Sequence, residues 1–239
     1  MKSKIEWLRN LDGSQGYSIN PIKGLCPVDC KDNQGKSYCY SRRMYKRFRW
    51  NPEIRYIGDG KFFDELQKIP RIKGTRIFIG STIELFGDWL KSDWFDGILE
   101  VISLFPFFTF IFLTKCPQNL SLWSPYPSNV YIGVSVTNQA MHNEAIVALS
   151  AIQAKVKFIS YEPLLSEIEA KYAYDLSELQ WVIIGRCTPP SAKTAPKIEW
   201  IKEIEDACKK RNIPYFEKNN LKTLLGRDLI QNYPIVTWR

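Results

Sequence analysis

The sequence predicts one α/β domain whose parallel sheet curls toward a barrel. Short apolar runs alternate with amphipathic stretches from residue 76 onward. The runs are rich in β-branched and aromatic residues without strict alternation, which is typical of strands buried on both faces. Polar residues follow successive runs, and a barrel gathers such positions at one mouth. The pattern therefore favours a barrel over an open, doubly wound sheet.

Seven runs are expected to form strands. The first, residues 17–22, lies directly before a group of three cysteines. The six that follow along the chain are residues 76–80, 108–114, 130–136, 156–160, 181–185 and 214–217.

Amphipathic stretches between these runs predict helices over residues 94–104, 139–154 and 198–211. The last stretch follows Pro196 and places Ile201, Ile204 and Cys208 on one face, so Cys208 is expected in the core. His142, near the start of the second stretch, is expected to be exposed and receives no role.

The chain of 239 residues is expected to form a single domain, residues 1–239, because no linker or low-complexity tract divides it. It contains a cysteine loop at residues 24–40 and a C-terminal extension from about 212 to 239. The longest near-apolar stretch, residues 101–113, is too short to span a bilayer. The N-terminus carries acid and lacks an apolar secretion signal. These features predict a cytoplasmic protein without a membrane segment.

Positive charge is concentrated at the start of the chain. The net charge is +8, and residues 1–50 hold eleven basic and four acidic residues. Much of this excess lies in and just after a basic helix expected around residues 41–48, in Arg42, Arg43, Lys46, Arg47 and Arg49. Such a patch attracts nucleic acid or a phosphorylated substrate. The alternative is a solvated helix face that only aids solubility, and charge runs are usually of this kind.

Three of the six cysteines, Cys26, Cys30 and Cys39, share one loop with the spacing C-x3-C-x8-C. In a cytoplasmic chain, clustered thiols indicate metal or redox use. Three thiolates would leave one iron of a cubane cluster free to chelate S-adenosylmethionine. The spacing alone leaves open thiols without metal, and also a zinc site completed by Cys116, Cys187 or His142.

The residues around these cysteines resemble the cluster loop of radical S-adenosylmethionine (SAM) enzymes. That loop is usually C-x3-C-x2-C and commonly ends in Tyr-Cys-Tyr, as residues 38–40 do here. This chain departs from the usual spacing, because about six extra residues at 32–37 separate its second and third cysteines. In order, the chain also resembles blocks of the phage Gp37/Gp68-like radical SAM family, which is also described as a domain of unknown function. These blocks are IEW (5–7), IGSTIELF (79–86), LTK (113–115), IGVS (132–135), SYEPLL (160–165) and WVIIG (181–185).

The resemblance implies a partial (β/α)6-type TIM-like barrel with a radical SAM core. It implies a [4Fe-4S] cluster held by Cys26, Cys30 and Cys39, with S-adenosyl-L-methionine as the second cofactor. Reductive cleavage of this cofactor would give a 5′-deoxyadenosyl radical that abstracts hydrogen from a substrate. An electron donor of the flavodoxin or ferredoxin type is implied as a partner.

Cofactor contacts implied by the resemblance are Tyr38, Tyr40, Gly80, Ser81, Ser135 and Glu162. Tyr38 would lie near the cluster and the adenine, Gly80 and Ser81 near the methionine amino group, and Ser135 near the ribose. Pro163 fixes an extended backbone that would direct Glu162 into the barrel. Asn138, which also follows a strand, is interpreted as a helix cap.

Substrate contacts are expected at the barrel mouth from Glu84, Lys115, Arg186, Cys187 and Lys218. The three cations would suit a carboxylate or phosphate. The chain departs from the family pattern at Cys116, at residues 186–188 and at residues 216–219, and these departures bear on substrate choice more than on the cluster. Inert packing is the favoured interpretation of both Cys116 and Cys187. The alternative for either residue is a substrate-contacting or radical-quenching thiol.

These expectations favour a radical SAM enzyme that acts on an unknown substrate. The basic segment, and a loose likeness to lyases that repair DNA photoproducts, point to a nucleic acid or nucleotide and to base modification or lesion repair. A base in duplex DNA would have to be flipped out to reach a barrel mouth. The alternative is a zinc-stabilised nucleic-acid-binding protein without catalysis. A metal-dependent nuclease is disfavoured, because no carboxylate–histidine cluster is evident.

Overall fold

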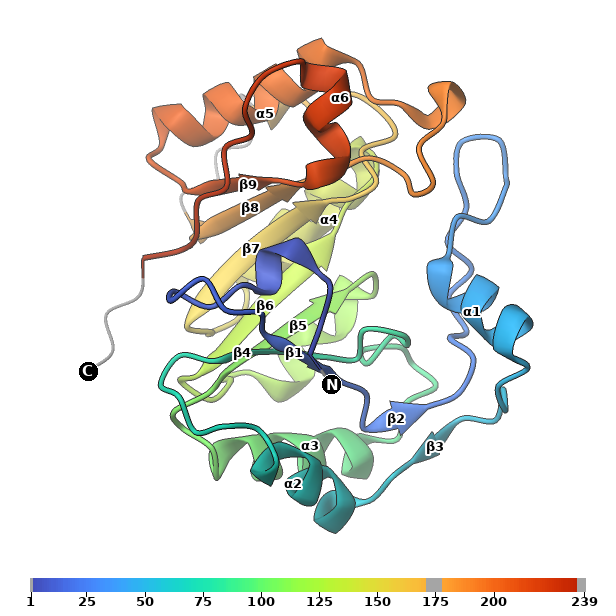
Figure 1. The fold of residues 1–239 in the computed structure, drawn as a ribbon, viewed down its shortest axis with the longest axis vertical. Coiled ribbons are helices and arrows are strands. Elements are labelled where there is room, and N and C mark those ends of the chain that lie inside the picture. Colours follow the sequence, from blue (N-terminus) through green and yellow to red (C-terminus); the bar gives the residue numbers. More distant parts are fainter. Residues whose placement is uncertain (1, 171–177, 236–239) are drawn as a thin grey trace.

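The structure, a computed structural model, describes residues 2–170 and 178–235 (Figure 1). Seven parallel strands form a curled half-barrel, which confirms the predicted α/β class. The sheet has one strand more than the six-stranded barrel type. Its order is β1 (Tyr17–Ile19), β4 (Arg76–Ile79), β5 (Thr109–Thr114), β6 (Val130–Ser135), β7 (Val156–Tyr161), β8 (Trp181–Ile184) and β9 (Tyr215–Glu217).

The chain leaves the sheet between β1 and β4. This excursion contains β2 (Ile22–Lys23), α1 (Tyr40–Phe48), β3 (Arg55–Tyr56) and α2 (Asp59–Gln67). The prediction of one strand over residues 17–22 is wrong, because Pro21 has no N–H to donate and interrupts the strand. Residues 22–23 pair instead with β3 in a separate antiparallel ribbon. In Figure 1, α1 stands apart from the sheet beyond this ribbon.

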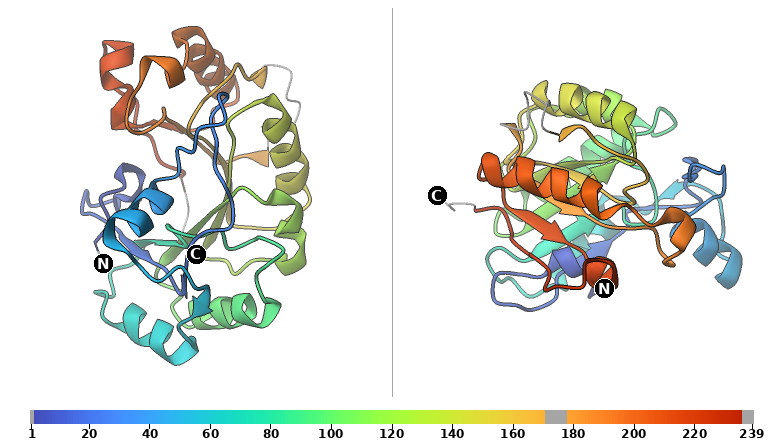
Figure 2. Two further views of the ribbon diagram at one scale, coloured as in Figure 1. Left: turned by 90° about the vertical axis from the view of Figure 1, so that its right-hand side faces the viewer. Right: turned by 90° about the horizontal axis from the view of Figure 1, so that it is seen from above.

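Helices cover the outer face of the curled sheet (Figure 2). They are α3 (Ser92–Ser103), α4 (Gln139–Ser150) and α5 (Ile198–Lys210), with α2 beside α3 and a short α6 (Lys222–Leu225) after β9. The predicted helix over 139–154 ends early, because Gln153 bonds to another loop. Its N–H donates to Ser124 Oγ at 2.9 Å, and its carbonyl accepts from Tyr126 N–H at 2.9 Å.

Two apolar clusters fill the fold, one on each face of the sheet. The larger lies between the strands and the outer helices and includes Ile77 and Ile132. The smaller lies inside the half-barrel and includes their chain neighbours Phe78 and Tyr131. Successive side chains of a strand point to opposite faces, so each apolar strand contributes to both clusters. Cys208 is fully buried in the larger cluster, as predicted.

The N-terminal segment packs inside the half-barrel. A 3-10 turn over Glu6–Leu8 places the indole of Trp7 against Phe78 and Trp181, with ring centroids 5.1 Å and 6.1 Å apart. The C-terminal segment reaches the same interior, because Trp181 Nε1–H donates to the carbonyl of Asn232 at 2.9 Å. Both ends of the described chain therefore pack against β8, which is next to one edge of the sheet.

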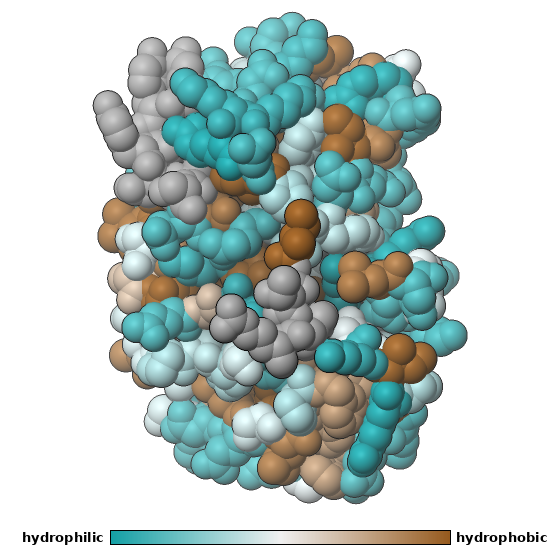
Figure 3. All heavy atoms as spheres, turned by 90° about the vertical axis from the view of Figure 1, so that its left-hand side faces the viewer, coloured by the Kyte–Doolittle hydropathy of each residue, from teal (hydrophilic) through white to brown (hydrophobic). Residues whose placement is uncertain are grey.

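The molecular face opposite α1 mixes hydrophilic and apolar side chains in small groups (Figure 3). Among the helices that the structure describes, none is both long enough and apolar enough to cross a bilayer.

Two polar side chains fix the start of α4. Asn138 Oδ1 accepts the N–H of Met141 at 3.0 Å, which confirms the predicted helix cap. The predicted exposure of His142 is wrong: 1% of the side chain is exposed, and Nδ1 lies 2.9 Å from the Tyr161 hydroxyl. His142 shares the inward face of α4 with Ala145, three positions later, and this register buries it.

We expect His142 to make stability depend on pH, because burial lowers its pKa from 6.5 to about 4. The unfolded chain takes up this proton first, so the free energy of unfolding should fall between pH 6.5 and pH 4, by about 3 kcal/mol. His142 is the only histidine, so a single imidazole NMR signal reports its titration. A His142→Leu variant should lose this part of the pH dependence. An imidazole that titrates near pH 6.5 would contradict the expectation.

A second prediction concerns the buried carboxylate of Glu217 at the end of β9, which is fully buried. Arg227 donates to both of its oxygens, at 2.7 Å and 2.9 Å, and to Glu205 at 2.6 Å. An Arg227→Met variant leaves two buried carboxylates without this partner and should cost about 3–5 kcal/mol in urea unfolding. Lys222→Met, which removes the exposed pair with Asp228, is the control and should cost less than about 1 kcal/mol. Equal losses would contradict the argument.

Candidate functional site

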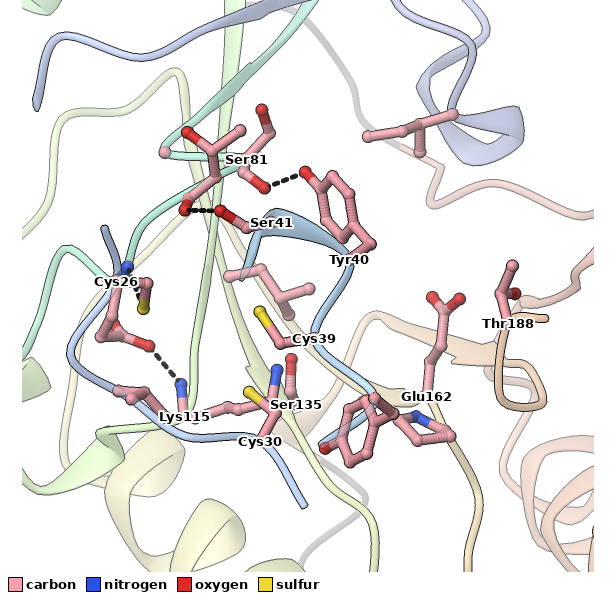
Figure 4. A pocket seen from close by; sticks show the side chains of 18 of the residues that line it. Cys26, Cys30, Cys39, Tyr40, Ser41, Ser81, Lys115, Ser135, Glu162 and Thr188 are labelled. Atoms are coloured by element: carbon pink, nitrogen blue, oxygen red, sulfur yellow. Dashed lines mark hydrogen bonds between the residues drawn. The ribbon is translucent and has the colours of Figure 1, made fainter. Parts of the chain in front are cut away.

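The carboxyl ends of strands β4 to β9 meet at one cavity of about 500 Å³, a volume in the range of small-molecule sites (Figure 4). Every one of these strands contributes a lining residue from its end or from just after it. All the site residues predicted from the sequence line this cavity: Cys26, Cys30, Tyr38, Cys39, Tyr40, Gly80, Ser81, Glu84, Lys115, Ser135, Glu162, Arg186, Cys187 and Lys218. The fold brings them together, while their individual roles stay predictions.

The three loop cysteines lie between β2 and α1, and all are free thiols. Figure 4 shows their side chains around the cavity together with Lys115 and Glu162. A hydrogen bond between Cys30 and Cys39 raises the pKa of Cys30 and lowers the pKa of Cys39. Burial raises the pKa of Cys26, whose sulfur accepts the backbone N–H of Glu84 at 3.4 Å.

The thiols surround the cavity and do not converge on one point. Among residues 2–170 and 178–235, no three Cys, His, Asp or Glu side chains come together as a single-ion site requires. His142, one candidate for completing a zinc site, is bonded to Tyr161 in the core.

The extra residues between the second and third cysteines form a turn that reaches the far side of the mouth. Asp32 Oδ1 accepts the N–H groups of Gln34 and Lys36, each at 2.9 Å. Asn33 Nδ2 donates to the carbonyl of Leu165, beyond the end of β7, at 2.8 Å. The turn therefore attaches the cysteine loop to the later half of the sheet.

Two basic side chains of α1 hold the cysteine loop in place. Arg42 donates to the carbonyl of Cys26 at 3.0 Å. Arg43 donates to the carbonyls of Tyr38 and Thr188, at 3.0 Å and 2.9 Å. The predicted basic patch is thus divided, because these two arginines bind the protein itself.

The start of α1 is bonded to the loop that follows β4. The Tyr40 hydroxyl donates to the carbonyl of Ser81, and Ser41 Oγ donates to the carbonyl of Thr82 at 2.7 Å. From the end of β1, Asn20 Oδ1 accepts the Ser81 hydroxyl at 3.2 Å and the Thr82 N–H at 3.1 Å. Two segments, the start of α1 and the end of β1, therefore fix the position of this loop at the cavity.

Gly80 makes the sharp turn between β4 and this loop. Its φ of +80° lies in the left-handed region, where a side chain is strained. A Cβ atom here would also come within 2.5 Å of Leu85 Cδ1. Glycine is therefore required for the backbone of residues 80–82 to line the cavity.

Glu84 is buried, and protein donors saturate its carboxylate. Oε1 accepts the N–H groups of Leu85 and Phe86 at 3.1 Å and 2.9 Å and the hydroxyl of Thr114 at 2.6 Å. Oε2 accepts the N–H of Lys115 at 2.8 Å. A carboxylate offers about four acceptor sites, so these bonds use its capacity. The role of Glu84 as a substrate contact stays a prediction, and in the structure these bonds fix the loop after β4 to the end of β5.

The three cations expected at the mouth all line the cavity, and two of them have partners in the protein. Lys218 forms an ion pair with Glu162 and lies 3.7 Å from Glu6. Burial acts against the charged form, but the two carboxylates raise the pKa of Lys218. Arg186 donates to the carbonyl of Ser191 at 3.1 Å. The Lys115 ammonium has no hydrogen bond or ion pair within the part of the chain that the structure describes.

The two other thiols named from the sequence lie in different settings. Cys187 is buried at the cavity wall close to Tyr38, and burial raises the pKa of that phenol. Cys116 is partly buried beside the cavity, and burial raises its pKa to about 12. A protonated, shielded thiol at Cys116 agrees with the packing interpretation. Ser135 ends β6 and lies at the cavity.

Sequence reasoning missed three residues that organise the cavity: Glu6, Asn20 and Ser41. Asn20 directly follows the first strand, so the same polar-after-strand signal could have identified it. Ser41 adjoins the last loop cysteine, but nothing in the sequence indicates its partner Thr82. Glu6 comes from the N-terminal turn, and only the fold brings it to Lys218.

The residues present fit a [4Fe-4S] cluster with SAM beside it. Thiolates are the soft ligands that iron–sulfur clusters take, and three free thiols share this loop. The hydrogen bond from Glu84 N–H to Cys26 is of the kind that tunes such clusters. Beside the thiols, the cavity has apolar walls from Trp7, Phe78 and Leu113 and a polar rim.

Comparison with solved structures supports the fold. One neighbour is a mutant spore photoproduct lyase with bound AdoMet and dinucleoside spore photoproduct, with a TM-score of 0.54 and 15% identity over 84% of this chain and 75% of that one. A second spore photoproduct lyase mutant gives a TM-score of 0.53 and 17% identity over 84% and 76% of the two chains. At such identities the likeness shows a shared fold.

Comparison by sequence gives the family. No curated protein matches the chain. Residues 2–222 match the family described as "Protein of unknown function (DUF5131)". This match covers most of the 239 residues, including the cysteine loop and every cavity residue, and the chain therefore belongs to the DUF5131 family.

Proposed function

We propose that this protein is a radical SAM enzyme. Cys26, Cys30 and Cys39 would bind a [4Fe-4S] cluster, and S-adenosyl-L-methionine would occupy the adjoining cavity. When bound, these cofactors supply a 5′-deoxyadenosyl radical, made by reductive cleavage, for hydrogen abstraction from a substrate. One observation carries the proposal: three free thiols of one loop line the same cavity as all the strand-end residues expected to contact SAM.

The fold supports this proposal. Spore photoproduct lyase shares the curled half-barrel, and one of its structures contains AdoMet. The resemblance to the phage Gp37/Gp68-like radical SAM family adds support. Two of the resembling blocks, IGSTIELF and SYEPLL, contribute residues 80–84 and 162–163 to the cavity wall.

The loop after β4 supplies acceptors for the amino group of the cofactor. The carbonyls of Ser81 and Thr82 each accept one hydrogen bond, from Tyr40 and Ser41. A carbonyl oxygen has two lone pairs, so each can accept a second bond from an ammonium group. Asn20 holds this backbone from the other side, which orients both oxygens before a ligand binds.

The substrate we propose is a nucleic acid or nucleotide, with base modification or photolesion repair as the reaction. The concentration of basic residues before residue 50 supports an anionic substrate. The dinucleoside photoproduct bound by the spore photoproduct lyase shows that this fold accommodates such a molecule in that enzyme. An electron donor of the flavodoxin or ferredoxin type completes the proposal, with the cytoplasm as its setting.

We expect protein reconstituted anaerobically with iron and sulfide to be brown and to form 5′-deoxyadenosine from SAM when dithionite is added. A Cys26→Ala/Cys30→Ala/Cys39→Ala variant should lose the colour and the product, because it lacks the three iron ligands. Iron content, visible absorbance and chromatography of the nucleoside measure both outcomes.

Cys208→Ala is the matched control, since this thiol lies in the core away from the cavity, and it should keep colour and product. Product formation that survives in the triple variant would reject the proposal. A colourless wild-type protein with one bound zinc would instead identify the zinc-stabilised alternative.

We expect Glu84→Gln to weaken both the fold and the cluster site. The amide keeps an oxygen for the three donors at Oε1 but places an NH2 group against the N–H of Lys115. Leaving buried donors unpaired should cost about 1–3 kcal/mol in urea unfolding of the cluster-free protein. The iron content per chain after reconstitution should also fall. A weakened carboxylate site would let the loop shift, and the backbone N–H of residue 84 in this loop donates to Cys26. Glu144→Gln, on the exposed side of α4, is the control, and equal behaviour of the two variants would contradict the positioning role.

A further inference from the structure

The end of α1 carries an exposed group of aromatic and basic side chains, here called the aromatic–basic surface: Lys46, Arg47, Phe48, Arg49 and Trp50. Phe48 is 51% exposed and Trp50 is 43% exposed. Among the described residues, the exposed aromatic side chains are Tyr40, Phe48 and Trp50, so all of them belong to this helix and its end. Exposed aromatic residues gathered in one place mark an interaction site.

The two aromatic rings form a platform. Phe48 and Trp50 stack with their centroids 5.5 Å apart and their planes at 22°. The Trp50 ring also packs edge-on against the Tyr45 ring, with centroids 5.3 Å apart. The backbone N–H of Trp50 donates to the Tyr45 carbonyl at 3.2 Å. The Tyr45 hydroxyl accepts the N–H of Gly24, at the start of the cysteine loop, at 2.9 Å. The platform is therefore held in a fixed orientation relative to the cavity.

The chain segment that carries the platform is rich in positive charge. Residues 33–52 contain six basic residues and no acidic residue. Arg42 and Arg43 are turned to the cysteine loop, whereas Lys46, Arg47 and Arg49 are exposed. These three form no ion pair with any residue in the described ranges, and Arg47 lies over the Phe48 ring at 5.3 Å. A stacked pair of exposed aromatic rings beside cations without ion pairs matches the bases and phosphates of a nucleic acid strand.

The platform is connected to the cavity along one face of α1. Tyr40, Met44 and Phe48 are four residues apart and lie on the same side of the helix. Tyr40 lines the cavity at one end of this row. Tyr40 and Phe48 are eight residue steps apart along the helix, or about 12 Å, which is the length of roughly three to four stacked nucleotides. A strand seated on the platform can therefore place a following nucleotide at the cavity.

We propose that the aromatic–basic surface binds a single nucleic acid strand, with bases stacked on Trp50 and Phe48 and phosphates at Lys46, Arg47 and Arg49. An acidic protein would match the charge, but it would not use a stacked aromatic platform. The binding surface stands on its own contacts. That the bound strand is also the substrate rests on the function proposed above.

The test is fluorescence anisotropy of a dye-labelled single-stranded oligonucleotide, roughly a dozen nucleotides long, titrated with the purified full chain without cluster or SAM. Trp50→Ala should weaken binding roughly tenfold, because it removes a stacking partner, whereas Trp50→Tyr should bind as the wild type does. Phe48→Ser is a second stacking variant at an exposed position and should act in the same direction. Circular dichroism and thermal melting establish that each variant is folded.

A Lys46→Gln/Arg47→Gln variant tests the phosphate contacts. Removing two cations should weaken binding and reduce the slope of log K against log salt by about 1.4. Lys202→Gln/Lys210→Gln removes two exposed lysines from α5 and should change neither quantity. Wild-type binding by both Trp50→Ala and Phe48→Ser would overturn the proposal, also where the charge variant alone weakens binding, because attraction of the phosphates needs no aromatic platform. The radical SAM assignment is unaffected by either result, because the assay requires neither cofactor.

Discussion

The site depends on one buried carboxylate. Glu84 lies among apolar side chains, where an ionised group without partners would be costly. Four donors from the loop after β4 and from the end of β5 remove this cost, and the backbone N–H of the same residue bonds to Cys26. A single residue thus sets the spacing between two strand ends and the first cysteine. The cavity that the three thiols line lies beside this junction.

A half-barrel leaves its interior open between its first and last strands, and the N-terminal segment fills this interior. Trp7 fills the interior between β4 and β8. One residue earlier, Glu6 reaches the ion pair of Lys218 and Glu162 at the ends of β9 and β7. The opening is therefore apolar inside and charge-paired at the rim. Lys218 is thus paired with carboxylates, whereas the Lys115 ammonium lines the cavity without a hydrogen bond or ion pair among the described residues.

The strands and the position of the site could be predicted because both depend on local pattern. Apolar runs such as 130–136 specify buried parallel strands, and the residue after each run must lie at the mouth. The partners of Glu84 and Lys218 could not be predicted, because they come from segments far apart in the chain. The burial of His142 could not be predicted, because it depends on the rotation of α4 against β7. The ribbon of β2 and β3 was missed because two-residue strands carry no periodicity.

The cysteine loop crosses the mouth, and this limits how a substrate can approach. Asn33 attaches it to the segment after β7, and Arg43 attaches it to the segment after β8. At its other end, Tyr40 and Ser41 attach it to the loop after β4. The first view in Figure 2 shows the loop and α1 in front of the curled sheet. Hydrogen bonds to the segments on both sides of the loop therefore obstruct access to the cavity over the loop.

Tyr40 is an exposed lining residue of the cavity at the start of α1. The row of Tyr40, Met44 and Phe48 on one side of this helix leads to the stacked rings of Phe48 and Trp50. The strand proposed above would therefore approach the cavity along α1.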